Sequence, residues 1–249
     1  MFINMKEKFL SRLKGLLFWP GWHPEVALRY LPVVAEIRKL KPRPTVLDVG
    51  SGGLGIAPYI GFKVTGVDVI FRPPFHSNLE RIKAKAQKLP FADNVYDAVV
   101  SVDSMEHLNP EMRKKAIKEM LRTARKLLVI AVPCGSESYK QDKLLARIYR
   151  KKFNKKYHFF EEQLRLGLPE TSEIKDTIID AGVNLKKKIS LKIINNESLA
   201  LRKFLMTGWI SKNIFANIFY RKILLLAIPL MRILNKPPVY RKIFVVKIK

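Results

Sequence analysis

The sequence of 249 residues is notably poor in cysteine and in long apolar runs. Its one cysteine, Cys134, excludes an internal disulfide and a cysteine-rich metal site, and is typical of a protein in a reducing cytoplasm. No uninterrupted apolar run reaches about eighteen residues, so a conventional membrane-spanning helix is not expected. The basic N-terminus leads into Trp-Pro-Gly without a small-residue cleavage pattern, which argues against a cleaved signal peptide.

Acidic side chains are also scarce. There are 21 Asp and Glu against 47 Lys and Arg, so the formal net charge is +26 at pH 7. A field of this sign concentrates anionic partners such as nucleic acid, acidic lipids or phosphorylated carriers. The charge predicts a polyanionic partner without selecting among these classes. The length fits a single α/β domain, 1–249, with additions.

The glycines that carry information gather in residues 46–55, VLDVGSGGLG. Thr45–Val49 is rich in β-branched residues and is bounded by prolines and by Gly50, which predicts a buried parallel strand. The turn that follows can adopt positive φ and approach a ligand closely, with amides at the start of a helix facing that ligand. Asp48 places a carboxylate beside the turn, which suits a positively charged ligand group.

A second acidic residue, Asp68, ends another strand-like run, Lys63–Asp68, eighteen residues after Gly50. In doubly wound folds, an acidic residue at about this spacing binds the hydroxyls of a ribose. Together, the two strands, the glycine turn and Asp68 predict a nucleotide-like ligand.

This arrangement resembles the class I S-adenosylmethionine-dependent methyltransferases, in particular the type 11-like domain with a D-x-G-x-G turn and a downstream L-P-F segment. The resemblance includes Leu89–Asp97, a strand at Asp97–Val102 and the triplet Glu106-His107-Leu108, and spans about residues 43 to 135. It implies S-adenosylmethionine as cofactor, no metal, and a doubly wound, Rossmann-like α/β sheet of seven strands whose last strand is antiparallel. The cofactor-binding residues that it implies are Asp48, Gly50, Ser51, Gly52, Gly53, Asp68, Val69, Gln87, Lys88 and Leu89.

The sequence departs from the family pattern at two places. The family often has an acidic residue a few positions before L-P-F, where this chain has Lys85, Ala86 and Gln87. Gln87 can accept the hydrogen bond of an adenine amino group, whereas Lys85 cannot. The expected helix after the glycine turn, Leu54–Ile60, is short and contains Pro58.

The remaining core elements follow from periodicity and capping signals. Asn109-Pro110-Glu111 predicts a helix start, and its buried stripe is expected at Ile117, Met120, Leu121 and Ala124, with Arg122, Arg125 and Lys126 at its end. Further elements are expected as a weak third strand within Arg81–Lys88, strands at Leu127–Val132, Leu185–Ile194 and Tyr240–Ile248, and a helix at Glu173–Ala181 stopped by Gly182.

Three additions surround this core. Residues 1–40 are expected to form helices, a basic amphipathic one at 5–18 and one at Glu25–Leu40 with Val33, Val34 and Ile37 inward. Residues 136–169 form a lysine-rich insertion, placed where related methyltransferases build the acceptor pocket. Residues 198–236 form a helical insertion before the last strand, with a polar face at Asn213, Asn217 and Arg221. This second insertion is interpreted as an interfacial helical pair on anionic lipid, with a lid or a dimer interface as the alternatives.

The reaction expected of such a protein is an in-line methyl transfer that needs positioning and exclusion of water. His107, just after the fourth strand, is the candidate general base for a hydroxyl acceptor, and His158 in the first insertion is the second candidate. Cys134 is expected in the pocket wall. The favoured hypothesis is O-methylation of a glycan, lipid-linked sugar or lipid intermediate by a peripheral protein on the cytoplasmic face of the cell membrane. The alternatives are an RNA methyltransferase, which the charge favours, and a non-catalytic peripheral membrane protein on a degenerate methyltransferase fold.

Overall fold

Seven strands form one mixed sheet in the order β3-β2-β1-β4-β5-β7-β6. The computed structural model describes residues 21–40 and 42–249, so the helix expected at 5–18 lies outside the described residues. Neighbouring strands are parallel from β3 to β5, while β7 is antiparallel to both β5 and β6. This confirms the predicted fold class. The strands are β1 (Val46–Val49), β2 (Val64–Asp68), β3 (Leu79–Lys83), β4 (Tyr96–Val102), β5 (Ala124–Pro133), β6 (Ile189–Ser198) and β7 (Val239–Ile248).

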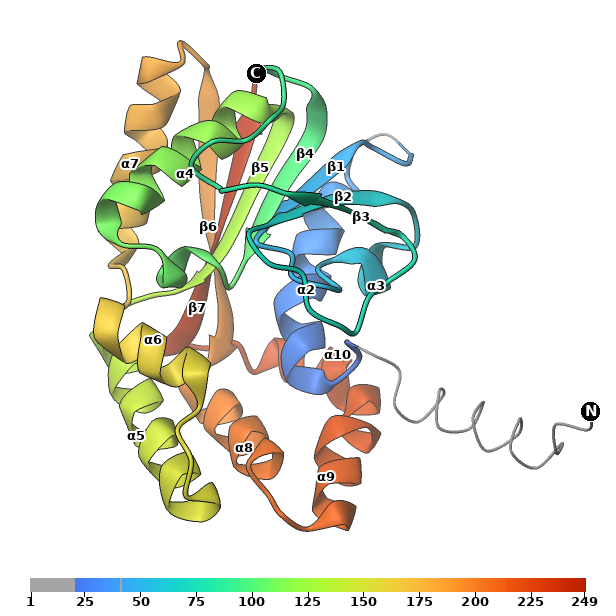
Figure 1. Cartoon of the computed structure of the whole chain (residues 1–249), viewed down its shortest axis with the longest axis vertical. Helices are drawn as coiled ribbons and strands as arrows, with labels where there is room; N and C mark the ends of the chain where they lie inside the picture. The colour runs from blue at the N-terminus through green and yellow to red at the C-terminus, as the bar shows by residue number, and fades with distance from the viewer. Residues whose placement is uncertain (1–20, 41) are drawn as a thin grey trace, which may run out of the picture.

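Helices cover both faces of the sheet (Figure 1). On one face, α2 (Pro24–Ile37) and α3 (Ala57–Ile60) pack against strand residues such as Val46 and Val100. On the other face, α4 (Pro110–Thr123) and α7 (Thr171–Asn184) pack against Leu47, Val99 and their neighbours. Because β1 and β4 are buried on both faces, their sequences are nearly continuous apolar runs. The inward residues expected of α2, Val33, Val34 and Ile37, are buried. Helix α3 begins at Ala57 and is shorter than the expected Leu54–Ile60.

The start of α4 is as predicted, but its end is not. The side chain of Asn109 accepts the Met112 N–H at 2.9 Å, with Pro110 in the first turn. The helix ends at Thr123, so Arg125 and Lys126 lie in β5 and both reach Asp97 of β4, at 2.6 and 3.6 Å. The prediction that these cations end the helix was wrong because strand pairing with β4 begins already at Ala124.

The boundaries around α7 also differ from expectation. The helix continues through Gly182 to Asn184, where Gly182 was expected to stop it. A Cβ at Gly182 would lie 2.9 Å from Ile189 Cδ1, so the glycine serves the packing of the helix on β6. Because the helix is longer than predicted, β6 begins at Ile189, later than the expected Leu185. Elsewhere in the sheet, β3 begins at Leu79, earlier than the expected Arg81.

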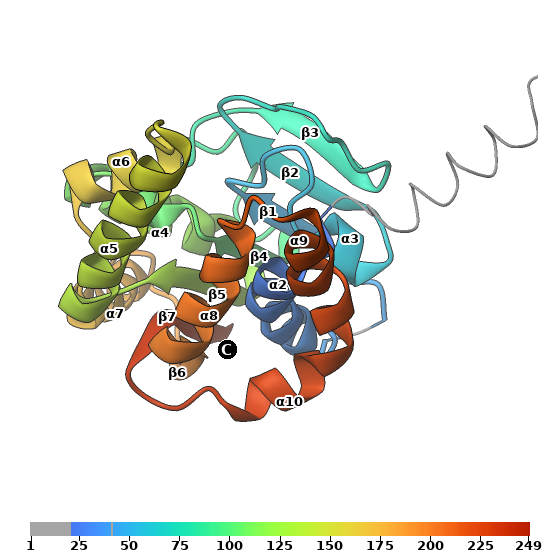
Figure 2. The same cartoon turned by 90° about the horizontal axis from the view of Figure 1, so that it is seen from below.

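The two insertions are helical. Helices α5 (Ser136–Phe153), α6 (His158–Leu166), α8 (Leu199–Trp209) and α9 (Ile214–Arg221) lie beyond the end of the sheet at which the parallel strands finish, whereas α10 (Ile228–Ile233) packs beside α2 (Figures 1 and 2). Gly208 of α8 faces the ring of Tyr220 of α9, and a Cβ there would overlap that ring. The described residues contain no helix long and apolar enough to cross a bilayer. The second insertion also includes η2 (Ile223–Ala227).

Candidate functional site

A cavity of about 1040 Å³ lies at the carboxyl ends of the parallel strands. One part of its lining comes from the glycine turn after β1, the end of β2 and the segment before Leu89. The other part comes from α2, η1 (Met105–His107), α6, α8, α9 and the start of β7. The ends of the parallel strands thus form one side of the cavity, and the insertion helices, together with α2, η1 and the start of β7, form the other.

The glycine turn is shaped by its neighbours. Gly50 has φ +78° and lies against Ser104, so a side chain at position 50 would overlap the serine hydroxyl. Gly52 has φ +55° and open space in front of it. Its N–H donates to Asp68 Oδ2 at 2.9 Å, and Asp68 Oδ1 accepts the Ile70 N–H at 3.2 Å. Asp68 therefore joins the ends of β1 and β2, and it lines the cavity together with the turn.

Asp48 lies behind the turn, outside the cavity lining. Its side chain is buried, and Oδ2 accepts the Ile56 N–H at 2.7 Å. Burial raises the pKa of this carboxyl to about 7, the Ile56 N–H opposes the rise and the charge of Asp68 adds to it. Asp48 thus supports the backbone of the turn, whereas the sequence placed its carboxylate beside a charged ligand group.

This pKa predicts a pH dependence of stability with a definite sign. Because the folded-state pKa of about 7 exceeds the ordinary 3.8, the folded protein holds a proton at Asp48 that the unfolded chain releases. The associated stabilisation is complete below about pH 4 and is lost as the pH rises to 7. Asp48→Asn keeps an acceptor for Ile56, so its free energy of unfolding should rise relative to wild type by up to about 4 kcal/mol across this window. Urea unfolding at pH 4.5 and 7.5 measures the difference, with the exposed Asp180→Asn as control. Parallel pH profiles for wild type and Asp48→Asn would contradict the assignment.

The other residues expected to bind the cofactor divide into two groups. Gly50, Ser51, Gly52, Gly53, Asp68, Val69 and Gln87 all line the cavity. Lys88 and Leu89 do not. Lys88 is exposed, and Leu89 is buried in the core with its N–H donated to Glu119 Oε2 at 2.9 Å. The segment therefore faces the cavity through Gln87 and the residues before it.

Both candidate histidines line the cavity. His107 lies in η1, and its Nδ1 is 2.8 Å from Glu162 Oε2 on α6. Its Nε2 is 3.9 Å from Glu106 Oε1. His158 is exposed at the start of α6, where its ring packs against Phe159. Cys134 does not line the cavity and lies in the core against α7, so its expected place in the pocket wall was wrong.

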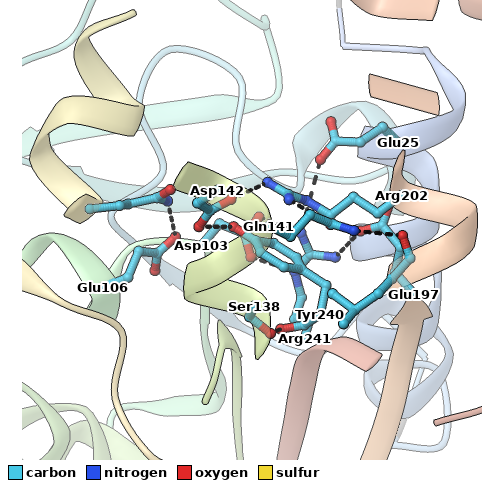
Figure 3. Close-up of polar contacts among 12 residues, drawn as sticks. Glu25, Asp103, Glu106, Ser138, Gln141, Asp142, Glu197, Arg202, Tyr240 and Arg241 are labelled. Carbon is cyan, nitrogen blue, oxygen red and sulfur yellow. Dashed lines mark hydrogen bonds and ion pairs between the residues drawn. The ribbon is translucent and has the colours of Figure 1, made fainter. Parts of the chain in front are cut away.

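A buried ionic cluster that was not predicted from the sequence contributes to the cavity lining (Figure 3). Asp103 follows β4 and lies between two arginines. Its oxygens are 2.5 and 2.6 Å from Arg241 and 3.0 Å from Arg29. Burial would raise the pKa of Asp103, but Arg241 and then Arg29 outweigh it and hold the pKa below its ordinary value. Arg241 also bonds Glu197 at 2.9 Å and Asn196 at 3.0 Å.

A second part of the cluster connects the two insertions to the sheet. Arg202 of α8 is 2.7 Å from Asp142 of α5, and its guanidinium lies 3.4 Å from the ring centre of Tyr240. The Tyr240 hydroxyl donates to Asp142 at 3.1 Å. The sequence does contain one sign of this cluster, which is Arg241 at the start of an apolar last strand. An arginine in a buried strand requires acidic partners, so its position indicates buried ion pairs.

Residues 47–129 match the family model of the methyltransferase domain. Over 101 residues the chain is 33% identical to an uncharacterized methyltransferase of Staphylococcus carnosus (strain TM300). Residues 47–129 are therefore a class I S-adenosylmethionine-dependent methyltransferase domain. The match covers 39% of this chain and 46% of the relative, so the chain spans less than half the length of the curated relative.

Solved structures with low sequence identity share the fold of this chain. One is magnesium protoporphyrin IX methyltransferase from Synechocystis PCC 6803 with bound SAH, at 13% identity and a TM-score of 0.51, covering 88% of this chain and 81% of that one. Another is the methyltransferase domain of bacterial CtHen1, at 13% identity and a TM-score of 0.52, covering 88% and 96%. Because each covers 88% of this chain, these likenesses extend beyond residues 47–129.

Proposed function

We propose that this methyltransferase transfers a methyl group from S-adenosylmethionine to a hydroxyl of a glycan, lipid-linked sugar or lipid intermediate at the cytoplasmic surface of an anionic membrane. The observation that carries the acceptor class is an exposed apolar surface on the second insertion, which also carries exposed cations, described below. The family supports the reaction type, and the cavity supports the division into a cofactor side and an acceptor side.

The cofactor side fits S-adenosylmethionine. Gly52 leaves open space in front of the turn, Asp68 offers a carboxylate for ribose hydroxyls, and Gln87 offers an amide for the adenine. The cofactor supplies a methyl group already activated by a sulfonium, so the protein has to position the acceptor and exclude water. His107 is the base proposed to take the acceptor proton, with His158 as the second candidate at the rim. The chemistry requires no metal, and the described residues contain no cluster of His, Cys, Asp and Glu arranged to hold one.

The acceptor side borders an exposed apolar surface on the second insertion, which we call the apolar patch. Phe215, Leu226 and Ile233 are 77%, 86% and 71% exposed, far more than is usual for side chains of this size. The same insertion carries exposed cations, among them Lys212, Arg221, Arg232 and Lys236. The patch consists of Phe204, Phe215, Ile218, Phe219, Ile223, Leu226, Leu230, Ile233 and Leu234.

Helix α9 contributes residues both to the patch and to the cavity lining. Tyr220 and Arg221 line the cavity, while Phe215 and Phe219 of the same helix are exposed. The polar residues of α9 have local roles, since Asn213 caps the helix by accepting the Ala216 N–H at 3.1 Å and Asn217 donates to Ser211 O at 2.6 Å. Exposed apolar side chains accompanied by cations are typical of surfaces that lie in the interface of anionic bilayers. A lipid-linked acceptor held there would have its polar end within reach of the cavity.

Flotation with vesicles of phosphatidylglycerol and phosphatidylcholine tests the membrane surface. Wild type should float with the vesicles at low salt, and the double variant Phe215→Ser, Leu226→Ser should lose at least about tenfold in partitioning, because each large apolar side chain contributes up to about 1.5–3 kcal/mol when buried. Val183→Ser is the matched control, since Val183 is 73% exposed on α7, away from the patch. Wild type remaining in the soluble fraction would contradict the proposal.

The acceptor class is tested by labelling. Cell extract incubated with the protein and methyl-labelled S-adenosylmethionine should carry label in its lipid or glycan fraction. Label in RNA, together with RNA binding that survives moderate salt, would instead support the RNA methyltransferase that the charge suggests. No transfer to any fraction, despite saturable cofactor binding, would favour a non-catalytic membrane protein.

A further inference from the structure

His107 lies between two glutamates that come from different parts of the chain. Glu162 on α6 is 2.8 Å from Nδ1, and Glu106 in η1 is 3.9 Å from Nε2. All three side chains line the cavity. Glu162 stands about 55 positions after His107 in the sequence, and only the docking of α6 on η1 brings the two together.

We propose that Glu162 is a positioning residue that keeps the proton of His107 on Nδ1, and that the acceptor hydroxyl binds at Nε2 while Glu106 binds a second hydroxyl of the same acceptor. This inference rests on the proposed function, and it specifies an acceptor with neighbouring hydroxyls, as in a sugar ring.

The role of Glu162 follows from hydrogen-bond chemistry. An ionised carboxylate only accepts hydrogen bonds, so Nδ1 must donate at the observed distance. In the neutral ring, the proton on Nδ1 leaves Nε2 bare. Glu162 thus fixes which nitrogen can accept a proton, as carboxylates do for functional histidines elsewhere.

The role of Glu106 follows from its unfilled bonding capacity. Its side chain is fully buried, Oε1 accepts a hydrogen bond from Gln163 at 3.4 Å, and Oε2 has no partner among the described residues. A buried polar atom without a partner is costly, and at a cavity wall it indicates a contact that a ligand supplies. Burial, and then the charge of Asp103, raises the pKa of Glu106 to about 8, so at pH 7 this side chain is mostly neutral and can both donate and accept.

The step balances with the groups named. The acceptor hydroxyl gives its proton to His107 Nε2 as its oxygen forms a bond to the methyl carbon. The bond between that carbon and sulfur breaks, and its electron pair stays on sulfur. The imidazolium then releases the proton to water, so the products are a methyl ether, S-adenosylhomocysteine and one proton.

The ring tautomer tests the role of Glu162 without any acceptor. Long-range ¹H–¹⁵N spectra of the full chain, labelled at histidine and saturated with S-adenosylhomocysteine, are recorded at a pH where the ring is neutral. The His107 signals are assigned by their absence in His107→Gln. Wild type should show a protonated Nδ1 and a bare Nε2, Glu162→Leu should show both tautomers, and Glu162→Gln should recover the wild-type pattern because its amide oxygen can accept.

The neighbouring glutamate provides the control. Glu161 is on the same helix but bonds Arg150 at 2.8 Å, so Glu161→Leu should leave His107 unchanged. An unchanged tautomer in Glu162→Leu would overturn the assignment, as would an equal change in Glu161→Leu.

Methyl transfer to the lipid and glycan extract of the producing cells separates the two glutamates. With Glu162→Leu the maximal rate should fall severalfold, at an almost unchanged half-saturating amount of extract. The loss should stay below the about 100-fold or more that removing general-base catalysis altogether would cost, because part of the rings keep the competent tautomer. With Glu106→Leu the half-saturating amount should rise about tenfold or more. A change confined to the maximal rate in Glu106→Leu would overturn the second hydroxyl contact. If wild type itself transfers no label, the proposed function fails, whereas the tautomer measurement still decides the role of Glu162.

Discussion

Replacement of Asp68 by alanine is expected to weaken the binding of S-adenosylhomocysteine by about 100-fold or more. The substitution removes the acceptor of the Gly52 and Ile70 N–H groups, and with it the link that holds the glycine turn to the end of β2. Hydrogen bonds to a charged acceptor contribute about 1.5–3 kcal/mol each, and every 1.4 kcal/mol is about tenfold in affinity. The carboxylate is also the proposed partner of the ribose hydroxyls, so the loss includes a direct contact.

Isothermal titration calorimetry measures this affinity. Asp68→Asn keeps one acceptor oxygen and should lose less, and Asp180→Ala, at an exposed position of α7, should bind as wild type does. A melting temperature close to that of wild type in each variant shows that the fold is retained. Binding of wild-type strength in Asp68→Ala would contradict the placement of the cofactor.

Replacement of Arg241 by methionine is expected to reduce the free energy of unfolding by about 3–5 kcal/mol. Arg241 is fully buried and makes ion pairs with Asp103 and Glu197. Its removal leaves two carboxylates in the interior with too few cations, and an unpaired buried charge carries a penalty of this size. Since a domain is typically stabilised by about 5–15 kcal/mol in total, the variant should unfold at a much lower urea concentration.

Lys247→Met is the matched control, because Lys247 is an exposed cation on the same strand. Its urea midpoint should stay within the range of ordinary surface substitutions, about 0.5 kcal/mol. A loss of less than about 1 kcal/mol for Arg241→Met would show that the cluster contributes little to stability.

The core of the fold could be predicted because its signals are local. The apolar run at Thr45–Val49, the glycines after it and the cap at Asn109 each specify an element through a few adjacent residues. The same locality explains the errors at helix ends. Ala124 belongs to a strand because it pairs with Tyr96 of β4, which lies far earlier in the sequence. Gly182 remains helical because the helix packs against Ile189 of β6, the strand that follows it, and a glycine pattern does not reveal this contact.

The acceptor side could be predicted only in part for the same reason. His107 follows a strand end and is therefore recognisable, but Glu162 joins it only after α6 docks against η1. Arg241, Asp103 and Arg29 come from three elements far apart along the chain, and no spacing rule relates them. For Asp48, the position beside the turn could be predicted from the sequence. The direction of its side chain, away from the cavity, could not, because the carboxylate accepts the Ile56 N–H.

The contact between Gly208 and Tyr220 has a consequence for the size of the acceptor. Tyr220 lines the cavity, whereas Gly208 lies behind its ring and is absent from the lining. Even the methyl group of an alanine at position 208 must displace the ring or spread α8 from α9. The space that this cavity offers to the proposed acceptor is therefore limited by a residue that does not line it.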